Sequence, residues 1–330
     1  MINSRNYISR LKIQQRKNNR KWLFYRICVI SISIFLIIII PSEIVKYYKS
    51  SQNKPEVKGI SSLNLTNISL SKIPKIKNQA KLPMVNSRQY ALVDAKSGYL
   101  VVSKDENKRV PIASMTKIAT ALVAIENYKL DEIVTISKNA SSTIGSDAQF
   151  KTGEQVKVID LLNAILISSA NDGAIALAEH SGSIENFVKK MNDKIDALGL
   201  TNTRFNDPSG LDDEGFSSAK DISIILTYAL RKPEIKSIVN QSQKEIISID
   251  GISHQLDNSN RLVKDEMYLS GIIGGKTGFT PIAGHNLIAA ATRNQHTLIA
   301  VIINTFDNSI TASAEEAKKL LEWGFTNLEY

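Results

Sequence analysis

A serine and a lysine three residues apart are the residues of this sequence best suited to chemistry. Ser114 and Lys117 lie in the stretch 111–122, which predicts the start of a buried helix, with Pro111 helping to set its entry. Residues three apart share a helix face, so the two side chains are expected to be neighbours. An amine kept neutral by burial can accept the proton of a serine hydroxyl. The pair therefore predicts acyl-enzyme chemistry without a histidine.

The Ser-x-x-Lys pattern is weak by itself because it occurs five times in the chain, and a serine at a helix start is commonly a cap. Two further stretches could complete a site. Ser169 and Asn171 lie between two helical patterns, where a turn would point both into a shared cleft. Lys276 and Thr277 lie on an expected strand flanked by glycines, which leaves room for a substrate backbone and suits a carboxylate. Taken by itself, the stretch with Ser169 and Asn171 is explained as a polar connection between helices. The Lys-Thr-Gly tripeptide is a weak signal by itself, because it recurs at 151–153.

Hydrophobic periodicity predicts the elements that must position these residues. The expected strands cover 90–94, 99–103, 287–292 and 297–304. The expected helices, besides the one that begins near Ser114 and reaches about Tyr128, cover 158–168, 173–179, 184–198, 219–230 and 314–324. Strands at both ends with helices between them predict an α+β fold, in which the two ends form one sheet and a helical lobe is inserted.

Positive charge is concentrated in the N-terminal tail. The chain has 41 basic and 32 acidic residues, and residues 1–26 contain eight basic and no acidic ones. The remainder is nearly neutral, so the high isoelectric point is no argument for nucleic-acid binding. Cys28 is the single cysteine, and the histidines show no ligand-like pairing, so we expect no intrachain disulfide and no metal site. We interpret all four histidines as structural or surface groups.

An apolar run predicts a membrane anchor. Residues 22–40 would form a helix of about 28 Å, close to the hydrocarbon thickness of a bilayer. The basic residues before it predict that 1–21 is a cytoplasmic tail and that the rest lies outside. No small-x-small cleavage site follows Ile40, which favours an uncleaved signal anchor over a removed signal peptide. Residues 41–86 are rich in Lys, Ser and Asn, which predicts a stalk. We expect residues 87–330 to form the folded domain.

The order of the three motifs, Ser-x-x-Lys, Ser-x-Asn and Lys-Thr-Gly, is the signature of penicillin-recognising serine enzymes. The sequence resembles the serine-type D-alanyl-D-alanine carboxypeptidases, the low-molecular-mass penicillin-binding proteins of the peptidase S11 type, over about residues 87–330. Besides the motifs, the resemblance runs through 91–98, 206–211, 218–221, 258–262 and 320–325. It implies a β-lactamase/transpeptidase-like fold, with a five-stranded antiparallel sheet flanked by helices and an inserted helical lobe.

The resemblance also implies a role for each motif. Ser114 would be the nucleophile, Lys117 its base, and Ser169 would relay a proton to the leaving amine. The substrate would be bound by Asn171, Lys276, Thr277, Gly278 and Phe279. The backbone N–H groups of Ser114 and Phe279 would form the oxyanion hole. The implied substrate is a peptidoglycan stem peptide ending in D-Ala-D-Ala, with β-lactams as inhibitors and neither metal nor organic cofactor. The implied location is a bacterial cell membrane, spanned once, with the catalytic domain outside.

Some alternatives remain open. Many relatives carry an arginine just before the last helix, whereas 310–314 contains no basic residue, which leaves carboxylate binding to the Lys-Thr-Gly motif. The same site could serve a D,D-endopeptidase. Glu214 lies in the interval where class A β-lactamases carry their deacylating glutamate, although 206–216 fits the carboxypeptidase pattern better. A penicillin-binding protein without catalytic activity, or a sensor, is a further alternative, but 1–21 is too short to fold as a cytoplasmic effector.

Overall fold

The computed structural model describes residues 72–264 and 267–330. The predicted cytoplasmic tail 1–21, the predicted anchor 22–40 and the first part of the predicted stalk lie outside these residues. Among the helices of the described part, none is long and apolar enough to cross a membrane.

In the described chain most helices lie between a first group of strands and a last group of strands, as expected. The strands are β1 (Lys75–Ile76), β2 (Ser87–Asp94), β3 (Leu100–Lys104), β4 (Ile133–Thr135), β5 (Gln155–Lys157), β6 (Gln243–Ile247), β7 (Ser253–Asp257), β8 (Ile272–Thr280), β9 (Gly284–Arg293), β10 (His296–Thr305) and β11 (Leu328–Glu329). The helices are α2 (Lys117–Asn127), α3 (Lys138–Ser141), α4 (Val158–Asn163), α5 (Asn171–Glu179), α6 (Ile184–Ala197), α7 (Ala219–Ala229), α8 (Pro233–Val239) and α9 (Ala312–Asn327). Shorter helical turns are η2 (Ala113–Thr116), η3 (Ala164–Ser168) and η4 (Arg261–Val263).

Five strands form one antiparallel sheet with the order β3-β2-β10-β9-β8. Its central strand β10 pairs with β2, so that Ile299 lies opposite Val93 and the two ends of the domain meet in the sheet. The strand that carries the Lys-Thr-Gly motif, β8, lies at one edge. The predicted α+β class with a five-stranded antiparallel sheet is therefore confirmed.

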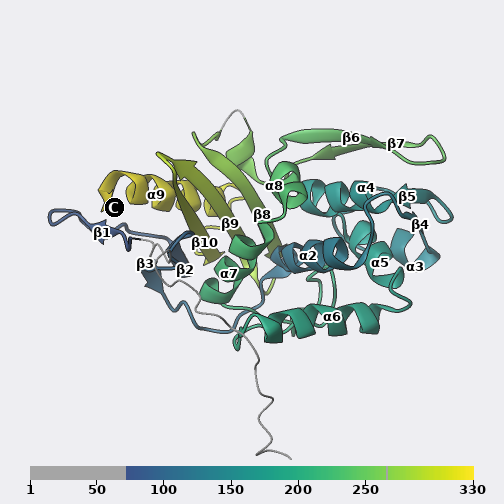
Figure 1. Cartoon of the computed structure of the whole chain (residues 1–330), viewed down its shortest axis with the longest axis horizontal. Helices are drawn as coiled ribbons and strands as arrows, with labels where there is room; N and C mark the ends of the chain where they lie inside the picture. The colour runs from purple at the N-terminus through teal and green to yellow at the C-terminus, as the bar shows by residue number, and fades with distance from the viewer. Residues whose placement is uncertain (1–71, 265–266) are drawn as a thin grey trace, which may run out of the picture. The chain divides into compact units, whose positions relative to one another are not determined.

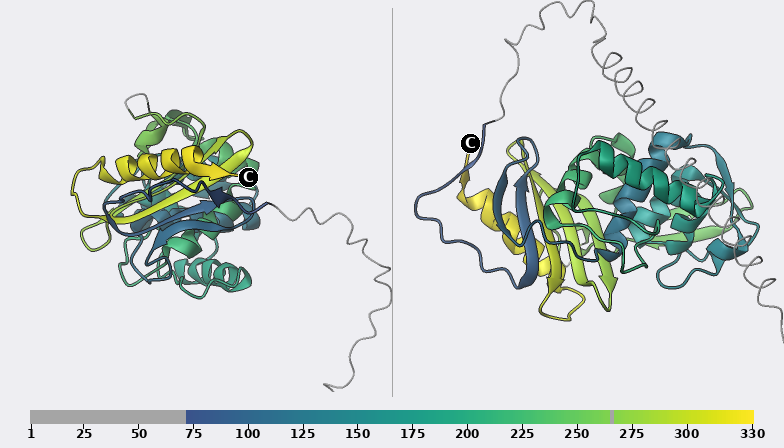
Figure 2. Two further views of the ribbon diagram at one scale, coloured as in Figure 1. Left: turned by 90° about the vertical axis from the view of Figure 1, so that its left-hand side faces the viewer. Right: turned by 90° about the horizontal axis from the view of Figure 1, so that it is seen from below.

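Alternate side chains of the sheet enter two hydrophobic cores. On β10, Ile299 and Val301 belong to the core that continues into the helical lobe, whereas Leu298 and Ile302 belong to the core beneath α9. The helix α9 covers one face of the sheet and α7 packs against the other (Figures 1 and 2). Because both faces are covered, the central strands read as almost continuous apolar runs.

The inserted lobe lies at one end of the sheet and comprises α2 to α6 with the small sheet β4–β5 (Figure 1). Serine caps set several helix starts: the hydroxyls of Ser137, Ser183 and Ser218 accept from a backbone N–H of the first turn. A β-hairpin formed by β6 and β7 lies over the lobe near α4 (Figure 1). Sequence periodicity did not predict this hairpin.

The segment 72–86, which falls in the predicted stalk, contacts the C-terminal helix. Strand β1 pairs with β11, and the indole N–H of Trp323 donates to the carbonyl of Lys81 over 2.7 Å. The backbone N–H of Asn86 donates to Glu316 Oε2 over 3.0 Å. These contacts hold the entry of the domain against α9.

Candidate active site

The first motif lies where the chain enters α2. Ser114 belongs to the 3₁₀ turn η2, which continues directly into α2 at Lys117. The Lys117 amine donates to Ser114 Oγ over 2.9 Å, as the three-residue spacing predicted. Ser114 is half-buried, whereas Lys117 is fully buried. The nucleophile candidate is thus accessible and the amine is shielded from water.

The backbone before Ser114 is held in an unusual conformation. Ala113 has a φ of 49°, in the left-handed region that residues with a side chain rarely adopt. Two glycines pack closely around it: a Cβ on Gly210 would lie 2.0 Å from the Ala113 carbonyl oxygen, and one on Gly278 would lie 2.5 Å from the Ile112 carbonyl oxygen. The loop that contains Gly210 and the strand β8 that contains Gly278 therefore pack directly against this turn and maintain its strain.

Lys117 makes two further hydrogen bonds in addition to that with Ser114. Its amine donates to Asn171 Oδ1 over 2.6 Å and to the carbonyl of Ser209 over 2.7 Å. Burial lowers the pKa of Lys117 to about 7, while the carboxylates of Asp207 and Asp172 oppose the decrease. Near neutral pH, the neutral and charged forms of this amine are both populated.

The second motif follows a π-helical turn. The turn η3 ends at Ser169, whose φ of 67° breaks the helical path before α5 begins at Asn171. Ser169 is buried, and its hydroxyl makes no hydrogen bond to the rest of the described chain. The Asn171 amide is fixed from both sides, since Oδ1 accepts from Lys117 and Nδ2 donates to the carbonyl of Ile144 over 2.7 Å. The predicted turn between two helices is present, with Asn171 directed at Lys117.

The third motif lies on the edge strand β8. Lys276 is fully buried and its amine donates to the carbonyl of Thr277 over 3.2 Å. Burial, reinforced by the positive charge of Lys117, holds the pKa of Lys276 well below its usual value. The Thr277 hydroxyl donates to Ser259 Oγ over 2.6 Å.

The remaining predicted residues of this strand have contrasting environments. Gly278 packs against η2, and the close approach described above leaves no space for a side chain. Phe279 is exposed and stacks on His285 with ring centroids 4.4 Å apart. The glycine thus brings the edge strand up to the turn that carries Ser114.

The loop before α7 closes another side of the site. One carboxylate oxygen of Asp207 accepts from the backbone N–H groups of Ser209 and Gly210, over 2.5 and 2.7 Å, and the other accepts from Asp212 over 2.8 Å. This arrangement fixes the Ser209 carbonyl that accepts from the lysine amine. Glu214, the candidate for a β-lactamase-type glutamate, is exposed on the same loop.

Two predicted residues and one unpredicted group meet at the Lys117 amine: Ser114, Asn171 and the carbonyl of Ser209. Asp207 and Ser259 were not predicted as site residues, although they lie in stretches 206–211 and 258–262 that carry the family resemblance. Within 72–264 and 267–330, no group of three His, Cys, Asp or Glu side chains is arranged to hold a metal ion.

Comparison with known proteins identifies the family of the chain. The profile of the D-alanyl-D-alanine carboxypeptidase family, peptidase S11, matches residues 76–307. The D-alanyl-D-alanine carboxypeptidase DacF of Bacillus subtilis is 34% identical over 250 residues, which cover 74% of this chain and 63% of DacF. The D-alanyl-D-alanine endopeptidase of Pseudomonas aeruginosa is 32% identical, with 78% of this chain and 84% of the relative covered.

Among solved structures, the Streptomyces K15 DD-transpeptidase superposes with a TM-score of 0.70 at 29% identity, covering 75% of this chain and all of that protein. The chain spans less than two thirds of the length of DacF and similar curated carboxypeptidases. The family match extends over both halves of the sheet and all three motifs. The chain therefore belongs to the peptidase S11 family of D-alanyl-D-alanine carboxypeptidases.

Proposed function

We propose that this protein is a serine-type D-Ala-D-Ala carboxypeptidase that removes the terminal D-alanine from peptidoglycan stem peptides through an acyl-enzyme on Ser114. One observation carries the proposal. The amine of Lys117 lies 2.9 Å from Ser114 Oγ, and its pKa is lowered by burial to about 7. At neutral pH a substantial fraction of this amine is free to accept the serine proton.

In the proposed reaction, Ser114 Oγ attacks the carbonyl carbon of the penultimate D-alanine while its proton passes to Lys117. The C–N bond then breaks, Ser169 relays a proton to the leaving amine of D-alanine, and an ester remains on Ser114. Water hydrolyses that ester, which restores the hydroxyl and leaves a new carboxylate on the stem peptide. Backbone N–H groups of Ser114 and Phe279 would stabilise the oxyanion, each contributing roughly 3 kcal/mol.

The third motif would receive the terminal carboxylate of the substrate. Burial holds the pKa of Lys276 well below its usual value in the free site, and an arriving carboxylate would raise that pKa by favouring the ammonium form. Thr277 would donate to the same carboxylate. Asn171 Nδ2 uses one N–H for Ile144 and keeps the other for a substrate amide. β-Lactams, which present a comparable carbonyl and carboxylate, are the proposed inhibitors.

The proposal also includes a location at a bacterial cytoplasmic membrane, with the catalytic domain outside. Its support is the sequence alone: the apolar stretch 22–40 follows a tail of basic residues and precedes no cleavage site. Protease protection in inside-out and right-side-out vesicles tests this orientation. Digestion of the catalytic domain only in the orientation that exposes the outer face is the expected result.

The activity is tested by release of D-alanine from a peptide ending in L-Lys-D-Ala-D-Ala, using the full chain in detergent and its Ser114→Ala variant. We expect release by the wild type alone, together with covalent labelling of Ser114 by a fluorescent penicillin. A folded wild type that releases no D-alanine would contradict the carboxypeptidase assignment.

An endopeptidase activity on crosslinked stem peptides is a second candidate, supported by the 32% identity to the endopeptidase of Pseudomonas aeruginosa. Incubation with crosslinked muropeptide dimers distinguishes the two: formation of monomers would show the endopeptidase, and trimming of monomers alone the carboxypeptidase. A β-lactamase would turn over penicillin rapidly. We expect instead that penicillin leaves a long-lived ester on Ser114, because Glu214, the candidate for a deacylating glutamate, is exposed on its loop.

A further inference from the structure

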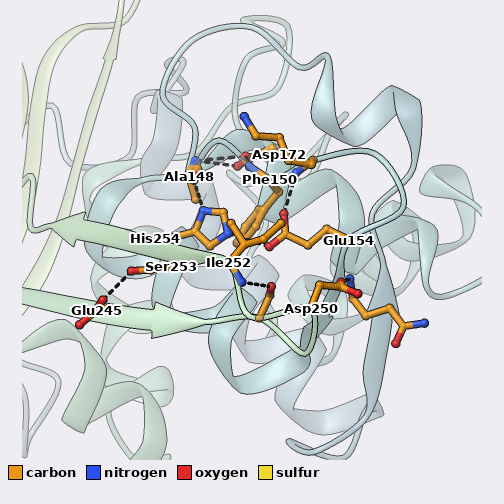
Figure 3. Close-up of polar contacts among 12 residues, drawn as sticks. Ala148, Phe150, Glu154, Asp172, Glu245, Asp250, Ile252, Ser253 and His254 are labelled. Carbon is orange, nitrogen blue, oxygen red and sulfur yellow. Dashed lines mark hydrogen bonds and ion pairs between the residues drawn. The ribbon is translucent and has the colours of Figure 1, made fainter.

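A buried histidine and glutamate lie next to the site without touching its reactive groups. His254 on β7 and Glu154 before β5 have side chains that are 4% and 0% exposed, and His254 Nε2 lies 2.7 Å from Glu154 Oε1. His254 Nδ1 lies 2.8 Å from the carbonyl oxygen of Ala148 (Figure 3). Both nitrogens of the imidazole are therefore committed to specific partners.

The partners determine where the protons are. A carbonyl oxygen can only accept, so Nδ1 of His254 carries a hydrogen that points at Ala148. His254 Nε2 lies against one carboxylate oxygen of Glu154, and the other oxygen of Glu154 accepts from the backbone N–H of Lys151 over 2.8 Å. The glutamate thus orients the ring, while the carbonyl of Ala148 requires the hydrogen on Nδ1.

Ala148 connects this pair to the second motif. Its N–H is shared between the two carboxylate oxygens of Asp172, each 3.1 Å away, and Phe150 N–H donates to the same carboxylate over 3.2 Å (Figure 3). Asp172 directly follows Asn171 in α5. The backbone of Ala148 therefore contacts His254 through its carbonyl oxygen and the start of α5 through its N–H.

The segment 144–150 also contacts Asn171 itself. The backbone N–H of Asn171 donates to the carbonyl of Ser146 over 2.7 Å, and its side-chain Nδ2 donates to that of Ile144 over 2.7 Å. Asn171 Oδ1 in turn accepts from the Lys117 amine over 2.6 Å. The orientation of the asparagine amide thus depends on the position of 144–150.

We propose that His254, oriented by Glu154, is a positioning residue of the active site: it holds the segment 144–150 against α5 and thereby holds the Asn171 amide on Lys117. The consequence for catalysis rests on the proposed function. His254 touches neither the serine nor the lysine, and it comes from a hairpin that is distant in sequence from the first two motifs.

An alternative role for the pair is only to fasten the hairpin β6–β7 to the lobe. The hairpin has other attachments there, since Asp250 accepts from the backbone N–H of Gln155 over 2.6 Å and Ile249 N–H donates to the carbonyl of Gln155 over 2.9 Å. If the pair served only to fasten the hairpin, losing either contact would lower stability and neither loss would slow acylation in particular.

Two substitutions separate these contacts. In His254→Asn, the amide nitrogen takes the place of Nδ1 and can donate to Ala148, while the contact with Glu154 is lost. In His254→Gln, the amide nitrogen takes the place of Nε2 and can donate to Glu154, while the contact with Ala148 is lost. Leu321→Ala, in the core beneath α9 on the other face of the sheet, is a control for general destabilisation.

Two quantities are measured on the full chain, well below each variant's melting temperature. The first is the rate at which a fluorescent penicillin acylates Ser114, and the second is the rate of amide hydrogen exchange in 144–150. We expect His254→Gln to acylate roughly ten- to hundred-fold more slowly and to exchange the Ala148 and Phe150 amides at least tenfold faster. His254→Asn and Leu321→Ala should stay within threefold of the wild type in both, even where they melt earlier.

Equal acylation rates in the Asn and Gln variants, whether both normal or both slow, would overturn the proposal. If the wild type itself is not acylated, the proposed function fails, and the exchange data alone decide the positioning role. Faster exchange at Ala148 and Phe150 in the Gln variant only would still support it, and the same exchange in both variants would overturn it.

Discussion

The hydroxyls of Thr277 and Ser259 lie 2.6 Å apart, so the residue proposed to hold the substrate carboxylate has a fixed polar neighbour. Thr277 donates to Ser259 in the free site. When a carboxylate binds, the two hydroxyls can reverse their direction, with Ser259 donating to Thr277 and Thr277 donating to the substrate, because each hydroxyl can donate once and accept twice.

We predict that Ser259→Ala raises KM for the tripeptide substrate roughly fivefold and leaves kcat within twofold, since one neutral hydrogen bond is worth about 1 kcal/mol. Steady-state release of D-alanine measures both constants. Ser253→Ala is the matched control, because that exposed hydroxyl donates to Glu245 on the hairpin. Identical KM values for the two variants would argue against a role for Ser259.

The acylation rate should rise with pH through a midpoint near 7 and then level off, because the pKa of Lys117 is lowered by burial to about 7 and only its neutral amine accepts the serine proton. Stopped-flow labelling with a penicillin between pH 5.5 and 8.5 would show this rise in the acylation rate. Lys117→Arg should acylate at least about a thousandfold more slowly, since a guanidinium remains protonated. A flat pH profile, or a reactive arginine variant, would exclude Lys117 as the base.

Asp207→Asn should move that midpoint to lower pH. The carboxylate of Asp207 favours the ammonium form of Lys117, so removing its charge lowers the pKa of the lysine further. Asp250→Asn is a suitable control, because this exposed carboxylate also accepts a backbone N–H, that of Gln155, but belongs to the hairpin turn. A midpoint displaced to higher pH in the Asp207 variant would contradict the electrostatic argument.

Gly210→Ala should destabilise the protein by about 3 kcal/mol or more, because its Cβ would lie 2.0 Å from the carbonyl oxygen of Ala113 and the backbone φ is +79°. Gly182→Ala provides the comparison: its φ is +98°, but a Cβ there would meet nothing within 4 Å. That control should lose only about 1 kcal/mol. Urea denaturation measures the free energy of unfolding of both variants. Equal denaturation midpoints would show that the close approach to Ala113 does not destabilise the Gly210→Ala variant.

Sequence periodicity predicted the elements whose apolar pattern is set by burial. The expected helix 184–198 is α6 (Ile184–Ala197), and the expected strand 297–304 is β10 (His296–Thr305). The hairpin β6–β7 was missed because its buried positions include His254 as well as Ile246 and Leu256, which interrupts the apolar alternation. The partner that makes a buried histidine acceptable, Glu154, is a hundred residues away in the sequence and leaves no local signal.

The site was predictable as far as side-chain chemistry defines it. Spacing alone indicated that Lys117 would lie beside Ser114, and motif order pointed to Asn171. The carbonyl of Ser209 could not be predicted, because every residue has such a group and only the turn around Asp207 directs this one at the lysine. The left-handed conformation of Ala113 is likewise a result of the packing of Gly210 and Gly278, which no local pattern encodes.

The pairing of β10 with β2 has a consequence for the order of folding. Residues that face each other across these strands, such as Val93 and Ile299, are about two hundred positions apart. Closing a loop of that length must precede any gain from the contact, which slows the step. The contacts between helices of the lobe join residues that are closer in sequence, so these contacts can form earlier. The β2–β3 hairpin cannot pair with β10 until that strand is present. The centre of the sheet therefore depends on a strand that is synthesised late, and a chain interrupted before His296 would lack the strand that joins the pair β2–β3 to the pair β8–β9.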